Sequence, residues 1–185
     1  VLLFAVCFCT TAQAASYYVC NTAENTGSDS NDGSLSTPWL TATKALQEMD
    51  TLSGGDNLYF CEGFDDTSTA DDVIASTGSC DAATPCTIDS YTPAGQDAGD
   101  DGVLPKITNT TYDVLQFAGG TLEDGGYVIN NLHLVGGSST DCVDISGGFS
   151  NVELNTVTYE NCVIGVDVAV VADEISVGID VIDGT

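Results

Sequence analysis

Three ionisable side chains in the second half of the chain could carry chemistry, namely Asp144, Asp167 and His133. Asp144 and Asp167 each lie between two aliphatic residues, so the alternation of side chains along a β-strand would turn both carboxylates outward. The two aspartates are 23 positions apart in the sequence. If their strands are neighbours in one sheet, the carboxylates lie about 5 Å from each other.

Two carboxylates at this spacing suit two kinds of chemistry. They could hold a calcium ion, or they could act as paired acid and base on a glycan, because close carboxylates raise one another's pKa. The alternative is that an acidic chain places aspartates side by side by chance. The register is also open, because aligning Cys142 with Cys162 gives an offset of 20 positions and separates the pair.

His133 stands between Leu132 and Leu134 and is the only histidine in the chain. Its imidazole is the one side chain whose ordinary pKa suits acid or base work near neutral pH. The same alternation turns it outward, where a lone histidine is more often merely exposed. His133 is therefore a weak catalytic candidate, as are Asp144 and Asp167.

The elements that must position these residues form a repeat. Short apolar runs separated by turn residues recur from Val103 onward, and Asp113–Gly120 (DVLQFAGG) matches Asp141–Gly148 (DCVDISGG) 28 positions later. Asn130 and Asn155, 25 positions apart, align in a second match and are expected to hydrogen-bond from one unit to the next. Units this short leave no room for crossover helices, so their strands must pair in parallel with the next unit.

The segment before the repeat predicts two strands and a helix. Tyr17–Cys20 (YYVC) and Leu58–Cys61 (LYFC) are short β-type runs that each end in Cys, and Thr41 can cap a helix over Ala42–Met49. If the two strands are parallel neighbours, Cys20 and Cys61 come within reach of a disulfide. A second disulfide, between Cys80 and Cys86, would close the short loop CDAATPC.

The beginning of the chain predicts export. Val1–Ala15 is an apolar run followed by small residues, and Ala12-Gln13-Ala14 fits the pattern that signal peptidase recognises. We expect residues 1–15 to be a signal peptide and residues 16–185 to form the domain. The run is too short to cross a bilayer, and the even number of cysteines beyond it suits an oxidising compartment.

The loop Gly27–Trp39 (GSDSNDGSLSTPW) has two interpretations. Its Asp, Asn, Ser and Gly residues favour tight turns with local side-chain hydrogen bonds. Asp29, Asn31 and Asp32 also match half of a calcium-binding loop, although Leu40 stands where a bidentate glutamate belongs. The turn is the stronger prediction, and calcium is kept as the alternative.

The charge of the chain limits its partners. Twenty-eight acidic residues against two lysines and no arginine give a net charge of −26, which excludes nucleic acid as a partner and favours divalent cations or a salty medium. A polyanionic polysaccharide would be repelled unless calcium bridged it to the protein.

The segments YYV, GSDSNDGSLSTPW, TATKALQEM and GGDNLYFCEG, followed by the repeat, resemble the right-handed parallel β-helix superfamily that includes pectate-lyase-like proteins. The resemblance covers Tyr17–Gly63 and about Val103–Val181. It implies an all-β solenoid with a short N-terminal capping helix. The cap would span about residues 16–63, an irregular loop region about 64–102, and the coils about 103–185, with further coils expected beyond Thr185.

The same resemblance suggests an extracellular carbohydrate-active protein, either a polysaccharide lyase or a glycoside hydrolase. Lyases of this superfamily commonly abstract a proton with a basic residue, and the chain has no Arg and no Lys after Lys106. The alternative is a secreted or cell-surface protein without catalytic activity, serving in adhesion or as a structural rod. The expected partner in either case is an extracellular polysaccharide or other glycan.

Overall fold

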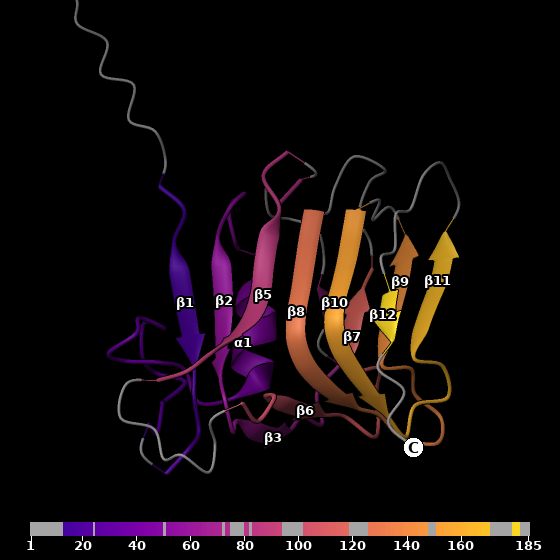
Figure 1. Ribbon diagram of the computed structural model, residues 1–185, viewed down its shortest axis with the longest axis horizontal. Coiled ribbons are helices and arrows are strands. Elements are labelled where there is room, and N and C mark those ends of the chain that lie inside the picture. Colours follow the sequence, from indigo (N-terminus) through magenta and orange to yellow (C-terminus); the bar gives the residue numbers. More distant parts are fainter. Residues whose placement is uncertain are drawn as a thin grey trace, which may run out of the picture.

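The computed structural model describes residues 13–23, 25–49, 51–71, 73–74, 80–81, 83–93, 102–118, 126–147, 151–170 and 179–181 (Figure 1). Most of the predicted signal peptide, part of the predicted loop region 64–102 and the end of the predicted coil region therefore lie outside the described residues. Among the described residues, no helix is long and apolar enough to cross a membrane.

Most of the strands belong to one large sheet of eight parallel strands. Its main path runs β1 (Ser16–Val19), β2 (Asn57–Cys61), β5 (Cys86–Tyr91), β8 (Gly126–Val135), β10 (Asn151–Glu160) and β12 (Ile179–Val181). Two further strands, β3 (Asp65–Thr67) and β6 (Lys106–Thr108), join it because β6 pairs with the second half of β8. Figure 1 shows the main strands side by side, in the order in which they follow along the chain.

A second sheet contains four parallel strands. They are β4 (Val73–Ile74), β7 (Leu115–Phe117), β9 (Val143–Gly147) and β11 (Val166–Val170), again arranged in chain order. The two sheets meet through a shared core, in which the ring of Phe117 from β7 lies 5.3 Å from the ring of Tyr127 from β8. Many inward positions of both sheets are aliphatic or aromatic and fully buried, among them Ile88, Ile129, Leu154, Leu115 and Ile145.

The prediction of a right-handed parallel β-helix is wrong for the part of the chain that the structure describes. Its strands are parallel, but they form two open sheets and not a closed solenoid. The repeat offsets could not reveal this, because an offset reports which residues are neighbours across one sheet and says nothing about closure. The chain runs as turns and bends through residues 136–142 and 161–165, between β8 and β9 and between β10 and β11.

The offsets themselves are confirmed as pairing registers. Asn130 of β8 pairs with Asn155 of β10, which is the predicted offset of 25. Gln116 of β7 pairs with Asp144 of β9, at the predicted offset of 28, and Asp144 pairs with Asp167 of β11 at 23. The alternative register that aligned Cys142 with Cys162 is thereby excluded for these strands.

A bend divides β8 and β10 at matching positions. Asn131 and Thr156 have left-handed backbones, with φ of 53° and 55°, and both fall at the one break in the pairing between the two strands. Asparagine tolerates this conformation, whereas the branched side chain of threonine makes it costly. The first arm of β8 pairs with β5 and its second arm pairs with β6, whereas β10 pairs with both arms of β8.

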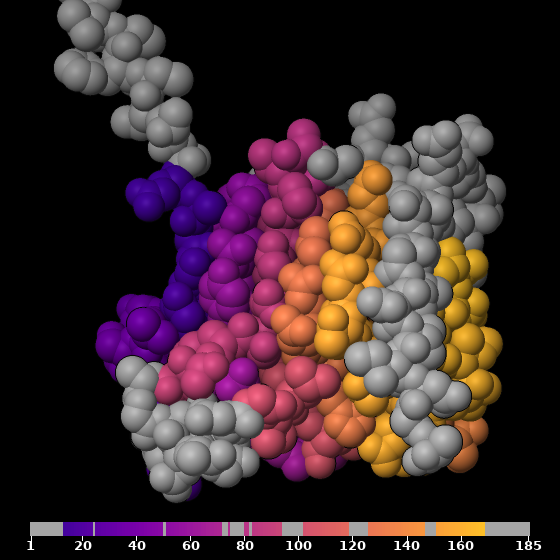
Figure 2. Space-filling model, in the orientation of Figure 1, coloured from indigo at the N-terminus to yellow at the C-terminus, as the bar shows by residue number. Residues whose placement is uncertain are grey.

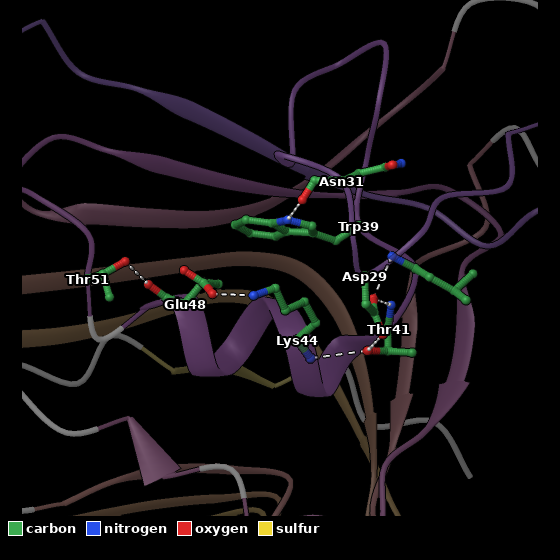
Figure 3. A network of polar contacts seen from close by, with 8 residues as sticks. Asp29, Asn31, Trp39, Thr41, Lys44, Glu48 and Thr51 are labelled. Atoms are coloured by element: carbon green, nitrogen blue, oxygen red, sulfur yellow. Dashed lines mark hydrogen bonds and ion pairs between the residues drawn. The ribbon is translucent and has the colours of Figure 1, made fainter.

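The predicted helix is present as α1 (Ala42–Met49), and it buries Ala42, Ala45, Leu46 and Met49. Figure 3 shows how the loop before it is anchored. The carboxylate of Asp29 accepts hydrogen bonds from the backbone N–H groups of Leu40 and Thr41, at 2.9 and 3.0 Å, and from the Thr41 hydroxyl at 2.8 Å. The Thr41 hydroxyl in turn accepts the N–H of Lys44, as expected of a helix cap.

Both expected disulfides are present, Cys20 with Cys61 and Cys80 with Cys86. The first joins the ends of the neighbouring strands β1 and β2, as their sequences predicted. A third disulfide, between Cys142 and Cys162, was not assigned from the sequence. It joins the turn before β9 to the turn before β11, so it links the β8–β9 connection to the β10–β11 connection.

Replacing Asp29 with alanine is expected to lower the free energy of unfolding by about 1–2 kcal/mol, because three hydrogen bonds to the start of the helix are lost. Urea denaturation would measure the change. The exposed Asp71 provides the matched control, and Asp71→Ala should leave the unfolding midpoint unchanged. If calcium raised the midpoint of the wild type but not of Asp29→Ala, the loop would be a metal site after all.

Candidate functional site

The outer face of the large sheet carries one row of aromatic and polar side chains across five strands. Tyr18 pairs with Tyr59, Tyr59 pairs with Asp89, and Asn130 pairs with Asn155. Ile88 of β5 pairs with Ile129 of β8, so Asp89, the next residue of β5, lies opposite Asn130. We call these five residues the cross-strand row.

Strand alternation explains why these residues face outward. Each of the first three precedes or follows a fully buried apolar residue: Val19 after Tyr18, Phe60 after Tyr59, and Ile88 before Asp89. Parallel pairing in register then brings the outward positions of neighbouring strands together. Figure 2 shows this face, where the side chains of successive strands lie in adjacent bands.

The first end of the row is an aromatic platform. The rings of Tyr18 and Tyr59 stack at 5.5 Å with 26° between their planes, and the ring of Tyr91 meets Tyr18 edge-on at 5.0 Å. All three side chains are half-buried. Burial raises the pKa of Tyr91 to about 12, and burial, followed by the neighbouring Tyr18 and Asp89, raises the pKa of Tyr59. The phenols of Tyr59 and Tyr91 are therefore neutral at physiological pH.

The other end of the row is a hydrogen-bonded chain of amides on a carboxylate. Asp89 accepts hydrogen bonds from the side-chain amides of Asn131, at 2.9 Å, and Asn130, at 3.3 Å. Asn155 donates to the Asn130 side chain at 3.1 Å and to Glu153 at 3.0 Å. The expected hydrogen bond between Asn130 and Asn155 is confirmed. These contacts fix the orientation of each amide.

A second group of ionisable side chains lies beyond the bend, on the second arm of β8. Register places Asp65, Lys106 and His133 in one row, from β3, β6 and β8. Lys106 pairs with Asp65 at 2.6 Å, and Nε2 of His133 lies 3.0 Å from Oε2 of Glu160 without the alignment of a hydrogen bond. The contact becomes an ion pair only when the imidazole is protonated.

His133 thus has neighbours that its sequence position did not reveal. Its side chain is 26% exposed, so the expected outward direction is confirmed in part. Asp65, Lys106 and Glu160 were not predicted to lie near it, because neither of the two repeat offsets connects β3 or β6 with β8.

The predicted aspartate pair lies on the second sheet, away from the cross-strand row. Asp144 and Asp167 are register neighbours, but Asp144 is engaged by the Gln116 amide, which donates to its carboxylate at 3.1 Å. Burial raises the pKa of nearby Asp141, and the negative charges of Asp113, Asp167 and Asp144 add to the effect. The pair therefore belongs to a concentration of negative charge at this end of the sheet.

Within the described part of the chain, no group of three or more His, Cys, Asp or Glu side chains could hold a metal ion. In the loop with the expected calcium residues, Asp32 accepts hydrogen bonds from the Thr37 hydroxyl at 2.6 Å and the Ser34 N–H at 3.0 Å. These bonds lower the pKa of Asp32, with Thr37 contributing most. Asn31 donates to the carbonyl of Pro38. The local contacts are those of the turn alternative.

No family model, no curated protein and no solved structure matches this chain. The likeness to pectate-lyase-like proteins thus stays a prediction from the quoted segments.

The raised pKa of Tyr91 predicts a loss of stability in alkali. An unfolded tyrosine ionises near pH 10, whereas Tyr91 in the fold does so at about 12. The contribution of the neutral Tyr91 phenol to the free energy of unfolding is fully present below pH 10, and it is lost as the pH rises from 10 through 12. Tyr91→Phe should therefore flatten the fall of the melting temperature between pH 9 and 12. Tyr112→Phe, at an exposed position, is the control, and an equal effect of both changes would contradict the assignment.

Proposed function

We propose that this chain is an extracellular glycan-binding protein and that the cross-strand row is its binding surface. The observation that carries the proposal is the juxtaposition of two stacked tyrosines with Asp89 and two oriented amides in one register row. A pyranose ring has an apolar C–H face and a rim of hydroxyl groups, and such a row offers a partner to each.

The two parts of the row contribute different interactions. Tyr18 and Tyr59 supply apolar area and aromatic faces for stacking, with little side-chain entropy to lose. Asp89, Asn130 and Asn155 supply acceptors and donors for hydroxyl groups. Because internal hydrogen bonds already hold the amides in place, a bound sugar would find them preorganised, which reduces the entropic cost of binding.

The charge of the chain favours a neutral glycan. Both lysines are committed, Lys44 to Glu48 and Lys106 to Asp65, and the chain has no arginine. Asp89 stands in the middle of the row, and the net charge of −26 adds a repulsive field for carboxylates and sulfates. A polyuronate would lack a cation to contact and would be repelled. This charge argument favours neutral sugars as the ligand.

An extracellular location is part of the proposal. It is supported by three disulfides, which form and persist in oxidising compartments, and by the signal-like N-terminal run. The protein would be released from the cell or held at the cell surface, in contact with polysaccharide.

A catalytic role on a glycan is the second candidate, and one arrangement favours it. His133 and Glu160 offer an acid and a base 3.0 Å apart, with Lys106 in the neighbouring strand. A lyase or hydrolase would need both groups to reach the same bond of the substrate. Catalysis would then be lost in His133→Ala, whereas glycan binding through the cross-strand row would remain.

Titration calorimetry with neutral glucan and mannan oligomers and with oligouronates tests the proposal. We expect binding of a neutral oligomer and weaker or no binding of uronates. Tyr59→Ala should lose about fivefold in affinity, since stacking is worth roughly 1 kcal/mol. Tyr112→Ala is a matched control outside the row, because Tyr112 is exposed.

Two outcomes would contradict the proposal. In one, no glycan binds to the folded protein. In the other, a glycan binds with the same affinity to the wild type and to Tyr59→Ala. Shorter products after incubation, absent with His133→Ala, would establish the catalytic alternative in its place.

A further inference from the structure

Asp56 is a buried carboxylate at the start of β2. The residue is only 6% exposed. One oxygen accepts the backbone N–H of Ala15 at 2.7 Å and the other accepts the N–H of Ser53 at 2.9 Å. A buried carboxylate is costly unless a cation or several donors compensate it.

No side-chain cation of the chain serves Asp56. The chain has two lysines, one histidine and no arginine. Lys44 pairs with Glu48, Lys106 pairs with Asp65, and His133 faces Glu160. The basic side chains are therefore all engaged with other acids, and the remaining source of positive charge is an α-amino group.

Ala15 lies directly after the sequence Ala12-Gln13-Ala14, the small-residue pattern at which signal peptidase cuts. Gln13 and Ala14 are exposed, whereas Ala15 is half-buried. A cut that follows the pattern falls after Ala14, one residue before the boundary predicted from the sequence, and makes Ala15 the first residue of the mature chain.

We propose that cleavage after Ala14 converts the backbone nitrogen of Ala15 into an ammonium group that forms a buried ion pair with Asp56. Water adds to the Ala14 carbonyl and the C–N bond breaks. Ala14 leaves with a carboxylate, and the released Ala15 amine takes up protons to become an ammonium. The cation is then produced 2.7 Å from Asp56, which is the one buried carboxylate among the described residues.

The backbone around Ala15 is already positioned for this pair. The carbonyl of Ala15 accepts the N–H of Asn57 at 2.9 Å, and the next residue, Ser16, pairs with Asn57 in the register of β1 and β2. Asp56 is itself fixed because its carbonyl accepts the N–H of Thr87 in β5. The new ammonium therefore needs no rearrangement to meet the carboxylate, and removal of the leader fastens β1 to the sheet.

The test begins with the full chain, preceded by an initiator methionine, expressed in a secreting host. Sequencing of the secreted protein from its N-terminus should give Ala15 first. A start at any other residue would overturn the proposal.

A thermodynamic cycle then measures the ion pair. The mature chain is prepared with a free Ala15 amine and with an acetylated one, each with Asp56 and with Asp56→Asn. Acetylation of the Asp56 form should lower the melting temperature at pH 6 by roughly 5–10 °C. Acetylation of the Asn form should change it much less, because the charge of the partner is already gone.

The exposed Asp71 again supplies the control, and Asp71→Asn should keep the full effect of acetylation. If Asp56→Asn fails to fold, the comparison of free and acetylated amine in the unchanged sequence decides the matter. Equal melting temperatures of these two forms would refute the ion pair. Neither result depends on whether the protein binds a glycan.

Discussion

Parallel pairing of backbones in a fixed register is the constraint on which the remainder of this structure depends. Each strand repeats the alternation of inward and outward side chains of the strand before it. One pairing register therefore defines both the inward rows that form the core and the outward rows that form the surface. The same pairing produces the buried residues Leu58, Ile88 and Ile129 and the outward-facing cross-strand row beside them. A slip of one residue in β5 would exchange Ile88 with Asp89 and destroy both core and site. The packing of the core and the composition of the cross-strand row are thus set by one register.

Sequence reasoning predicted the parts of the fold in which one residue type repeats. The asparagines of β8 and β10 and the aspartates of β9 and β11 recur at fixed offsets, and a fixed offset in a parallel sheet is a register. The helix was predictable because its four buried residues lie on one face. The closed solenoid was wrong because the offsets carry no information about the connections. These run as turns in residues 136–142 and 161–165 and leave two open sheets.

The candidate site was harder to predict than the fold, for a physical reason. Tyr18, Tyr59 and Asp89 are separated by 41 and 30 positions, and they differ in residue type, so no repeat connects them. The segment that forms β5 lies within the predicted irregular loop region 64–102, and only its pairing with β2 identifies Asp89 as an outward neighbour of Tyr59. The aspartates and the histidine were noticed because their residue types suggest chemistry, whereas a row of unlike residues across a sheet is visible only after the strands are paired.

The scarcity of cations shapes how the many carboxylates of this protein are used. With two lysines and 28 acidic residues, most acids cannot form salt bridges. Several instead accept backbone N–H groups, as Asp29 does before the helix, Asp81 in the turn between Cys80 and Cys86, and Asp113 beside β9. Such bonds hold turns in place at neutral pH, but they leave the negative charges uncompensated, so dissolved salt should stabilise the fold by screening repulsion more than it weakens the few ion pairs. The same uncompensated field surrounds the cross-strand row, so it would repel an acidic molecule that approached this face.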